Sequence, residues 1–115
     1  MRIVDIGAES APPVTEFESR ATRARHVADG SGESHVYVVH FDAGGVIGPH
    51  PAGFGQLFVA LSGSGWVAGA DGQRHSLKVG QAAVIDRGEI HSKGSDVGLE
   101  AVMIQIADLS VREPA

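Results

Sequence analysis

The sequence predicts an all-β domain, built as a sandwich or a barrel of short strands. Short runs rich in Val, Ile and Leu recur at regular spacing along the 115 residues, and turn residues separate them. Sixteen glycines are spread between these runs, which suits many tight turns, because each glycine inside a helix would cost up to about 1 kcal/mol. No ten-residue segment has a convincing helical pattern. Roughly seven to nine strands without a helix are typical of a sandwich or barrel.

The N-terminal part of the chain is the least regular. Residues 3–6 could form a short strand, but Pro12 and Pro13 each lack a backbone donor and interrupt regular pairing. Residues 17–27 are interpreted as an edge strand or an arm. We therefore expect residues 1–33 to form an irregular N-terminal arm or edge strands that belong to the same domain.

From residue 34 onward the strand pattern is regular. The predicted strands are 35–41, 54–61, 66–68, 73–78, 82–85 and 99–106. Ser-Gly-Ser-Gly at 62–65 is interpreted as a hairpin turn, and Ala-Asp-Gly at 70–72 as another. These strands predict a barrel over residues 34–108, followed by a C-terminal tail over residues 109–115.

The composition excludes several classes of protein. Nine Lys and Arg against fourteen Asp and Glu give a net charge of −5, so neither nucleic acid nor an anionic membrane is expected as a partner. Without cysteine, the chain has no disulfide, thiolate metal site or cysteine nucleophile. The longest apolar run, 57–61, is far shorter than the roughly twenty residues of a membrane helix. With no signal-peptide pattern at its start, we expect a cytoplasmic domain.

Two groups of residues in the predicted barrel have a distinctive spacing. The first contains Gly44, His50, Ala52, Gln56 and Gly63. The second, sixteen residues further on, contains Gly80, Asp86, Gly88, His91 and Ser95. Together they resemble the two motifs of the cupin family. This resemblance implies a small double-stranded β-helix, or jelly-roll barrel, which in many cupins holds a metal through three histidines and one glutamate.

The resemblance carries over only part of that ligand set. His50 and His91 match the first and third histidines, whereas Ala52 replaces the second and Gln56 replaces the glutamate. Imidazole suits Zn, Cu, Fe or Ni, but an amide oxygen is a weaker and uncharged ligand. The resemblance therefore implies a candidate site for a divalent transition metal (Zn, Fe, Ni, Cu or Mn) at His50, Gln56 and His91, with low affinity.

Strand alternation places Gln56 on the same face as Phe58. Because the strand is apolar on both faces around it, Gln56 needs a metal, a water or a ligand as its partner. Each candidate ligand also has a structural interpretation: His50 could cap a loop, Gln56 could bond within the sheet, and His91 could lie in a surface turn. The predicted pocket lining consists of Phe58, Ala52, His40 and Trp66.

Two functions of different classes are consistent with these residues. In the first, a metal at His50, Gln56 and His91 acts as a Lewis acid or oxygen-activating centre on a small substrate, with the reaction unassigned. In the second, the pocket binds or senses a small polar metabolite without metal or catalysis. The sequence leaves open whether the protein is an enzyme. A small jelly roll leaves an exposed sheet edge, so we also expect a homodimer, in which the N-terminal arm could pair with the second copy.

Overall fold

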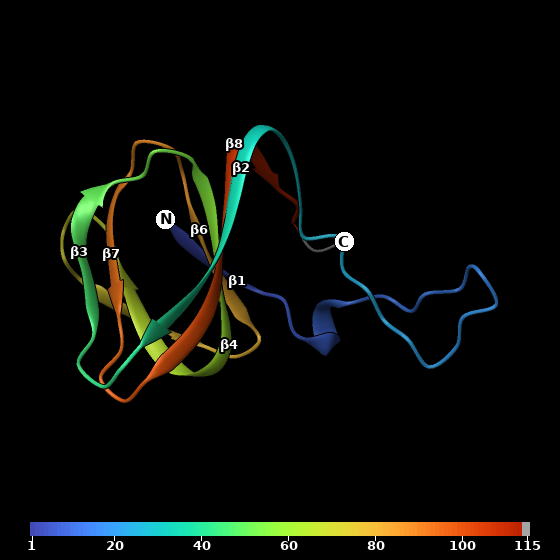
Figure 1. Ribbon diagram of the computed structural model, residues 1–115. Coiled ribbons are helices and arrows are strands. Elements are labelled where there is room, and N and C mark those ends of the chain that lie inside the picture. The colour runs from blue at the N-terminus through green and yellow to red at the C-terminus, as the bar shows by residue number, and fades with distance from the viewer. Residues whose placement is uncertain (114–115) are drawn as a thin grey trace.

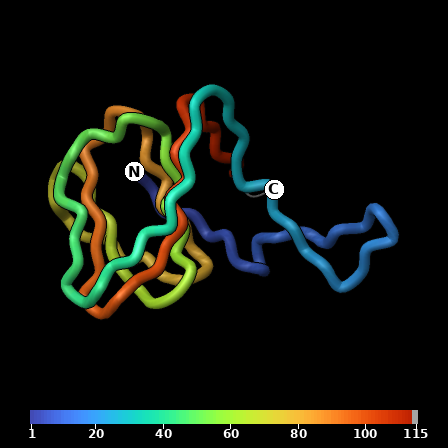
Figure 2. The backbone as a smooth tube through the Cα atoms, viewed as in Figure 1, coloured from blue at the N-terminus to red at the C-terminus, as the bar shows by residue number. Residues whose placement is uncertain are grey.

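The computed structural model describes residues 1–113 and confirms the predicted all-β jelly-roll barrel (Figures 1 and 2). Its elements are β1 (Arg2–Asp5), η1 (Ala8–Ser10), β2 (Ala28–Phe41), β3 (Val46–Pro51), β4 (Gly55–Ala68), β5 (Arg74–Lys78), β6 (Gln81–Ile85), β7 (Ile90–Gly94) and β8 (Leu99–Val111). None of the helices in this range has the length and apolar character to span a membrane.

The strands form two layers that face each other across the barrel (Figure 1). In one layer the order is β1-β6-β4-β8-β2, and in the other it is β5-β4-β7-β3, with every neighbouring pair antiparallel. The long strand β4 belongs to both layers, since its first half pairs with β6 and β8 and its second half with β5 and β7. This strand therefore joins the two halves of the barrel.

Apolar side chains from both layers fill the barrel. The buried members of this interior cluster are Phe41, Phe58, Ala60, Val67, Leu77, Ala83, Leu99 and Ala101. A second cluster, built on Leu57, Ala82 and Val84, packs together on the opposite face of the first layer. Leu57 and Phe58 fall in different clusters because neighbouring residues of a strand point to opposite faces.

The predicted hairpin turn at 62–65 is wrong, because β4 continues through these residues. A β-bulge shifts the pairing with β8 between Ala60 and Ser62. Gly63 follows with φ 77°, and a Cβ at this position would overlap the carbonyl oxygen of Gly98. The glycines here allow a bend and a close backbone approach, which carries the strand from one layer into the other.

Two strands of the second layer were not predicted. β3 contains Pro49 and Pro51, which argue against a strand, but it lies at the edge of its layer, where missing donors are tolerated. β7 is buried yet carries polar residues, so it lacks the apolar run expected of an internal strand. Both strands carry residues of the candidate site.

The N-terminal region combines a barrel strand with a projecting arm (Figures 1 and 2). β1 pairs with β6 at the edge of the first layer. Ile6 and Val27 still pack against the second cluster, and the chain between them extends away from the barrel. Phe17 in this arm is 90% exposed. β2 begins at Ala28, inside the segment predicted as irregular. Of the predicted tail, residues 109–111 complete β8, while 114–115 lie outside the described residues.

Candidate functional site

Two of the predicted ligands, His50 and His91, lie side by side on the neighbouring strands β3 and β7. They are register partners, and their ring centroids are 4.5 Å apart. Nδ1 of His50 donates to the carbonyl of Gly48 at 2.8 Å, and Nδ1 of His91 donates to the carbonyl of Glu89 at 3.2 Å. This tautomer leaves Nε2 of each ring as the acceptor.

The two imidazoles differ in their environment. His50 is exposed, whereas His91 is fully buried, and its Nε2 has no hydrogen-bond partner among residues 1–113. Burial lowers the pKa of His91, and the positive charge of Lys93 lowers it further. His91 is therefore held neutral, with a buried acceptor atom that nothing in the described chain satisfies.

Gln56 faces the interior as alternation predicted, but its partner is a residue that sequence reasoning missed. The Nζ of Lys93, on β7, donates to Oε1 of Gln56. Nζ also lies 3.7 Å from the sulfur of Met103 and 4.6 Å from the centroid of the Phe58 ring. Gln56 and Lys93 are only 3% and 1% exposed, so this pair belongs to the core of the barrel.

The charge of Lys93 has no compensating carboxylate among the described residues. The partners of Nζ are an amide oxygen, a thioether sulfur and a ring face. Burial lowers the pKa of Lys93 from its ordinary 10.5 to about 8, so the side chain is still mainly an ammonium at pH 7. Its position could have been found from the sequence, because alternation from an inward His91 points Lys93 to the same face.

The predicted ligands His50, Gln56 and His91, with Lys93 beside them, do not fit a tightly held divalent metal. Residues 1–113 contain no cluster of three His, Cys, Asp or Glu side chains arranged to hold one. The oxygen of Gln56, the third candidate ligand, already accepts from Lys93. An ammonium at this position repels a cation, and no carboxylate offsets the repulsion. The interior carries a fixed positive charge where the family resemblance implied a metal.

Of the four predicted lining residues, two lie against the interior. Phe58 is fully buried in the interior cluster, beneath Lys93. Ala52 is buried just after β3, where its N–H donates to the carbonyl of Glu89 at 3.0 Å and its carbonyl accepts from Gly88 at 2.7 Å. These two backbone bonds fix the turn that precedes His91.

The predictions that His40 and Trp66 line the pocket are wrong. Val39 and Phe41 pack into the barrel, so His40 between them points to solvent. There, Nδ1 of His40 lies 3.1 Å from Oε2 of Glu100. Trp66 faces the outside of the second layer, where the guanidinium of Arg74 covers its ring at 3.9 Å from the centroid. The bulge in β4 explains the orientation of Trp66, because one extra residue in that strand reverses which of the following side chains point inward.

Comparison with known proteins shows likeness in structure but not in sequence. No protein-family model matches the chain, and no curated protein matches it. A cupin-like protein from Thermotoga maritima aligns with a TM-score of 0.63 at 18% identity, covering 88% of this chain and 90% of that one. A cupin superfamily protein from Desulfitobacterium hafniense aligns with a TM-score of 0.60 at 15% identity, covering 94% and 100%.

A further match is a conserved protein of unknown function from Streptococcus pyogenes, with a TM-score of 0.60 and 20% identity. The alignment covers 66% of each chain, so this chain spans about two thirds of the length of that protein. The protein therefore has the double-stranded β-helix fold of the cupins, as its two motifs predicted. At these identities the likeness establishes the fold alone, and the function has to be inferred from the residues of this chain.

Proposed function

We propose that this protein binds a small polar metabolite in its barrel without a metal, and that Lys93 supplies the positive charge that selects it. The observation that carries the proposal is the buried ammonium of Lys93, whose described partners are all uncharged. A buried charge is costly unless it is paired and hydrogen-bonded. An anionic group beside Nζ would remove that cost, which favours a carboxylate on the ligand.

The two histidines narrow the chemistry of the ligand further. Nε2 of the neutral His91 is a buried acceptor to which no group in residues 1–113 donates, so it suits a hydroxyl group that donates to it. His50, exposed and 4.5 Å away between ring centroids, marks the side from which a ligand would enter. A small hydroxy acid meets both requirements, with its carboxylate at Lys93 and its hydroxyl at His91.

Lysine labelling gives a sharp test, because the chain contains only two lysines, Lys78 and Lys93. Protein labelled with ¹³C at lysine Cε is titrated with sodium glycolate, and with glycolamide as the neutral counterpart. Glycolate is expected to shift the Lys93 signal saturably and leave the exposed Lys78 unchanged, and Lys93→Met should abolish the response. If glycolate and glycolamide shift the Lys93 signal equally, or neither shifts it, the proposal is wrong.

A metal-dependent function of the same residues is the second candidate. Its support is the pair of imidazoles, each with Nε2 available, beside Gln56. It requires the ammonium of Lys93 to leave Gln56. Metal content by mass spectrometry on protein purified without chelator separates the two candidates. About one equivalent of a transition metal, lost in both His50→Ala and His91→Ala, would replace the metal-free proposal, whereas metal near zero with no uptake of added Zn, Fe, Ni, Cu or Mn supports it.

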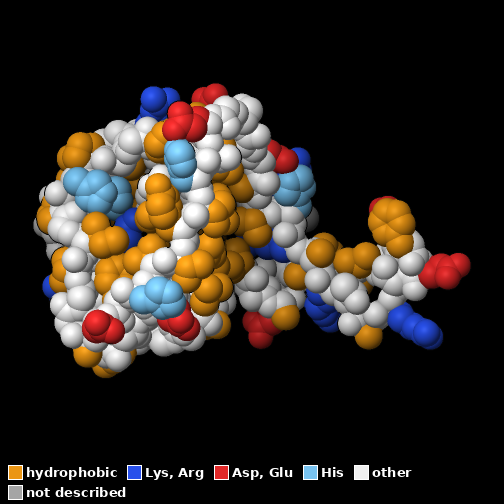
Figure 3. Space-filling view, in the orientation of Figure 1, with side chains coloured by type: hydrophobic (Ala, Val, Ile, Leu, Met, Phe, Trp, Pro, Cys, Tyr) orange, Lys and Arg blue, Asp and Glu red, His pale blue; other side chains and the backbone are white. Residues whose placement is uncertain are grey.

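We also propose that the protein is a homodimer that pairs through β2. Among the described strands β2 pairs only with β8, which leaves its other edge open. Val36, Tyr37 and Val38 on this strand are exposed, and hydrophobic side chains gather along the face shown in Figure 3. Residues 33–41 contain no lysine or proline that would block edge pairing. Light scattering after size exclusion is expected to show a dimer, and a monomer at high concentration would contradict the proposal.

A further inference from the structure

A cavity of about 470 Å³ lies at the base of the projecting arm, away from the barrel site. Its walls are residues 9–13, three residues at the end of the arm and the end of the chain beyond β8. The basic side chains that line it are Arg23, Arg25, His26 and Arg112. The acidic ones are Glu9 and Glu113, and Glu113 is already paired with Arg2 at 3.3 Å. The cavity thus carries excess positive charge on a chain whose net charge is −5.

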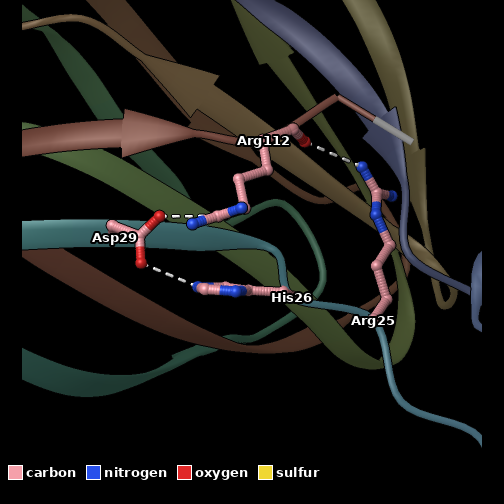
Figure 4. Close-up of polar contacts among 4 residues, drawn as sticks. All are labelled: Arg25, His26, Asp29 and Arg112. Carbon is pink, nitrogen blue, oxygen red and sulfur yellow. Dashed lines mark hydrogen bonds and ion pairs between the residues drawn. The ribbon is translucent and has the colours of Figure 1, made fainter. Parts of the chain in front are cut away.

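Asp29 holds part of this basic cluster in place (Figure 4). One of its carboxylate oxygens accepts from Nε of Arg112 at 2.6 Å, and the other lies 2.7 Å from Nε2 of His26. The backbone carbonyl of Arg112 in turn accepts from Nη2 of Arg25 at 3.2 Å. Two segments far apart in the sequence are therefore tied together, and the guanidinium of Arg25 is oriented by this contact.

Arg25 itself has no anionic partner in the described chain. Its Nε and Nη1 are buried and have no acceptor among residues 1–113. Neither Arg25 nor Arg23 forms an ion pair within the same range, and Nη1 of Arg23 reaches only the carbonyl of Ala11 at 3.4 Å. Buried donors on a charged group are normally paired, because leaving them unpaired costs more than leaving a neutral donor unpaired.

We propose that this cavity is an oxyanion site, in which Arg25 is the main donor to a carboxylate or phosphate group of a small solute. A guanidinium group presents donors in one plane, and their spacing matches the oxygens of a carboxylate or phosphate. Arg23, which lines the same cavity, adds positive charge. The cavity volume lies within the range of ordinary small-molecule sites. The proposal is independent of the barrel site, with which it shares no residue.

Inorganic phosphate is a suitable first probe. The protein is titrated with sodium phosphate at constant ionic strength, with sodium chloride as the matched series, and amide shifts of residues 25, 26 and 112 are followed by NMR. Saturable shifts confined to the cavity are expected. Arg25→Gln should raise the Kd for phosphate at least about tenfold, because it removes a charge-assisted hydrogen-bond donor. The control is Arg20→Gln, which alters an arm arginine outside this cavity and should leave the Kd within about twofold.

A second variant guards against an effect of misfolding. Arg25→Lys keeps the positive charge but loses the planar donors, so it should bind phosphate more weakly than the unmodified protein and more tightly than Arg25→Gln. The proposal fails if phosphate produces no saturable shifts, or if all variants bind it equally. It also fails if Arg25→Gln dissociates a dimer in light scattering, because the acceptor would then be a carboxylate of the second copy.

Discussion

Replacing Lys93 by methionine removes the ammonium from the barrel interior and should change how stability depends on pH. Methionine has a similar length and is apolar, so it fills nearly the same volume without a charge. The substitution also removes the donor to Gln56, whose buried oxygen then lacks a partner at a cost of about 1–3 kcal/mol. This second effect does not depend on pH, because a glutamine side chain does not titrate.

The pKa of Lys93 determines how much the free energy of unfolding changes with pH. Its ordinary pKa is 10.5, and burial lowers it to about 8 in the folded protein. Below pH 8 the lysine is charged in both the folded and the unfolded state, and folding bears the whole cost of burying that charge. Between pH 8 and 10.5 the unfolded state binds more protons, so the free energy of unfolding rises with pH. At about 1.4 kcal/mol per pH unit, the total rise is about 3 kcal/mol.

Urea unfolding, monitored by the fluorescence of the single tryptophan, Trp66, measures this effect between pH 7 and 10.5. The stability of the unmodified protein is expected to rise by about 3 kcal/mol relative to that of Lys93→Met across this range. At pH 7 Lys93→Met should be at least as stable as the unmodified protein. The size of its advantage depends on the free energy lost when Gln56 is left without a hydrogen-bond donor. Lys78→Met is the matched control, because Lys78 is exposed, and it should show no such difference.

Two outcomes would refute this reasoning. If the stabilities of the unmodified protein and Lys93→Met stay parallel across the pH range, the ammonium is not buried at a cost. If Lys93→Met is less stable than the unmodified protein at every pH by more than the loss of one hydrogen bond explains, the lysine contributes net stability. In either case the argument for an anionic ligand in the barrel would lose its basis.

Three other substitutions test the bulge in β4, the buried imidazole and the open sheet edge. Gly63→Ala forces a Cβ into a neighbouring carbonyl at positive φ and should lower the free energy of unfolding by about 2 kcal/mol or more, whereas Gly69→Ala, which meets nothing within 4 Å, should change it little in urea unfolding. Burial lowers the pKa of His91 below 6.5, so the unfolded state binds its proton more readily and stability should fall as pH drops below 6.5; His91→Leu should lose less stability in the same acid titration. Val38→Lys should reduce the dimer fraction in light scattering while Val79→Lys, outside the strands, leaves it unchanged.

Lys93 distinguishes the site of this chain from the metal site that the family resemblance implied. The two motifs grouped His50, Gln56 and His91 as candidate ligands, and in the structure His50 and His91 lie side by side on neighbouring strands while Gln56 is buried in the interior. The site differs from a cupin metal site because Lys93, which lies between the motif positions His91 and Ser95, places its ammonium group beside Gln56. A barrel of the cupin fold can therefore keep two of the metal-ligand histidine positions while a buried ammonium lies beside them.

The sequence by itself determined the class of fold and which residues of a regular strand share a face. Turn glycines and alternating apolar runs are local properties, so they predicted an all-β barrel without knowledge of distant contacts. Alternation along one strand was also enough to place Gln56 on the same face as Phe58. The resemblance of the two motifs to those of the cupins assigned His50 and His91 to one candidate site, although the strands that carry them, β3 and β7, were not predicted.

Only the tertiary structure decided which face of each strand is buried and what the inward polar groups contact. His40 is exposed because its neighbours along β2 pack inward, and that choice depends on strands far away in the sequence. Trp66 faces outward because a single-residue bulge in β4 reverses the alternation, which no local pattern reveals. The contact between Lys93 and Gln56 joins residues 37 positions apart in the sequence. Burial and pairing are properties of the whole packed chain, whereas alternation and turn preference belong to a few neighbouring residues.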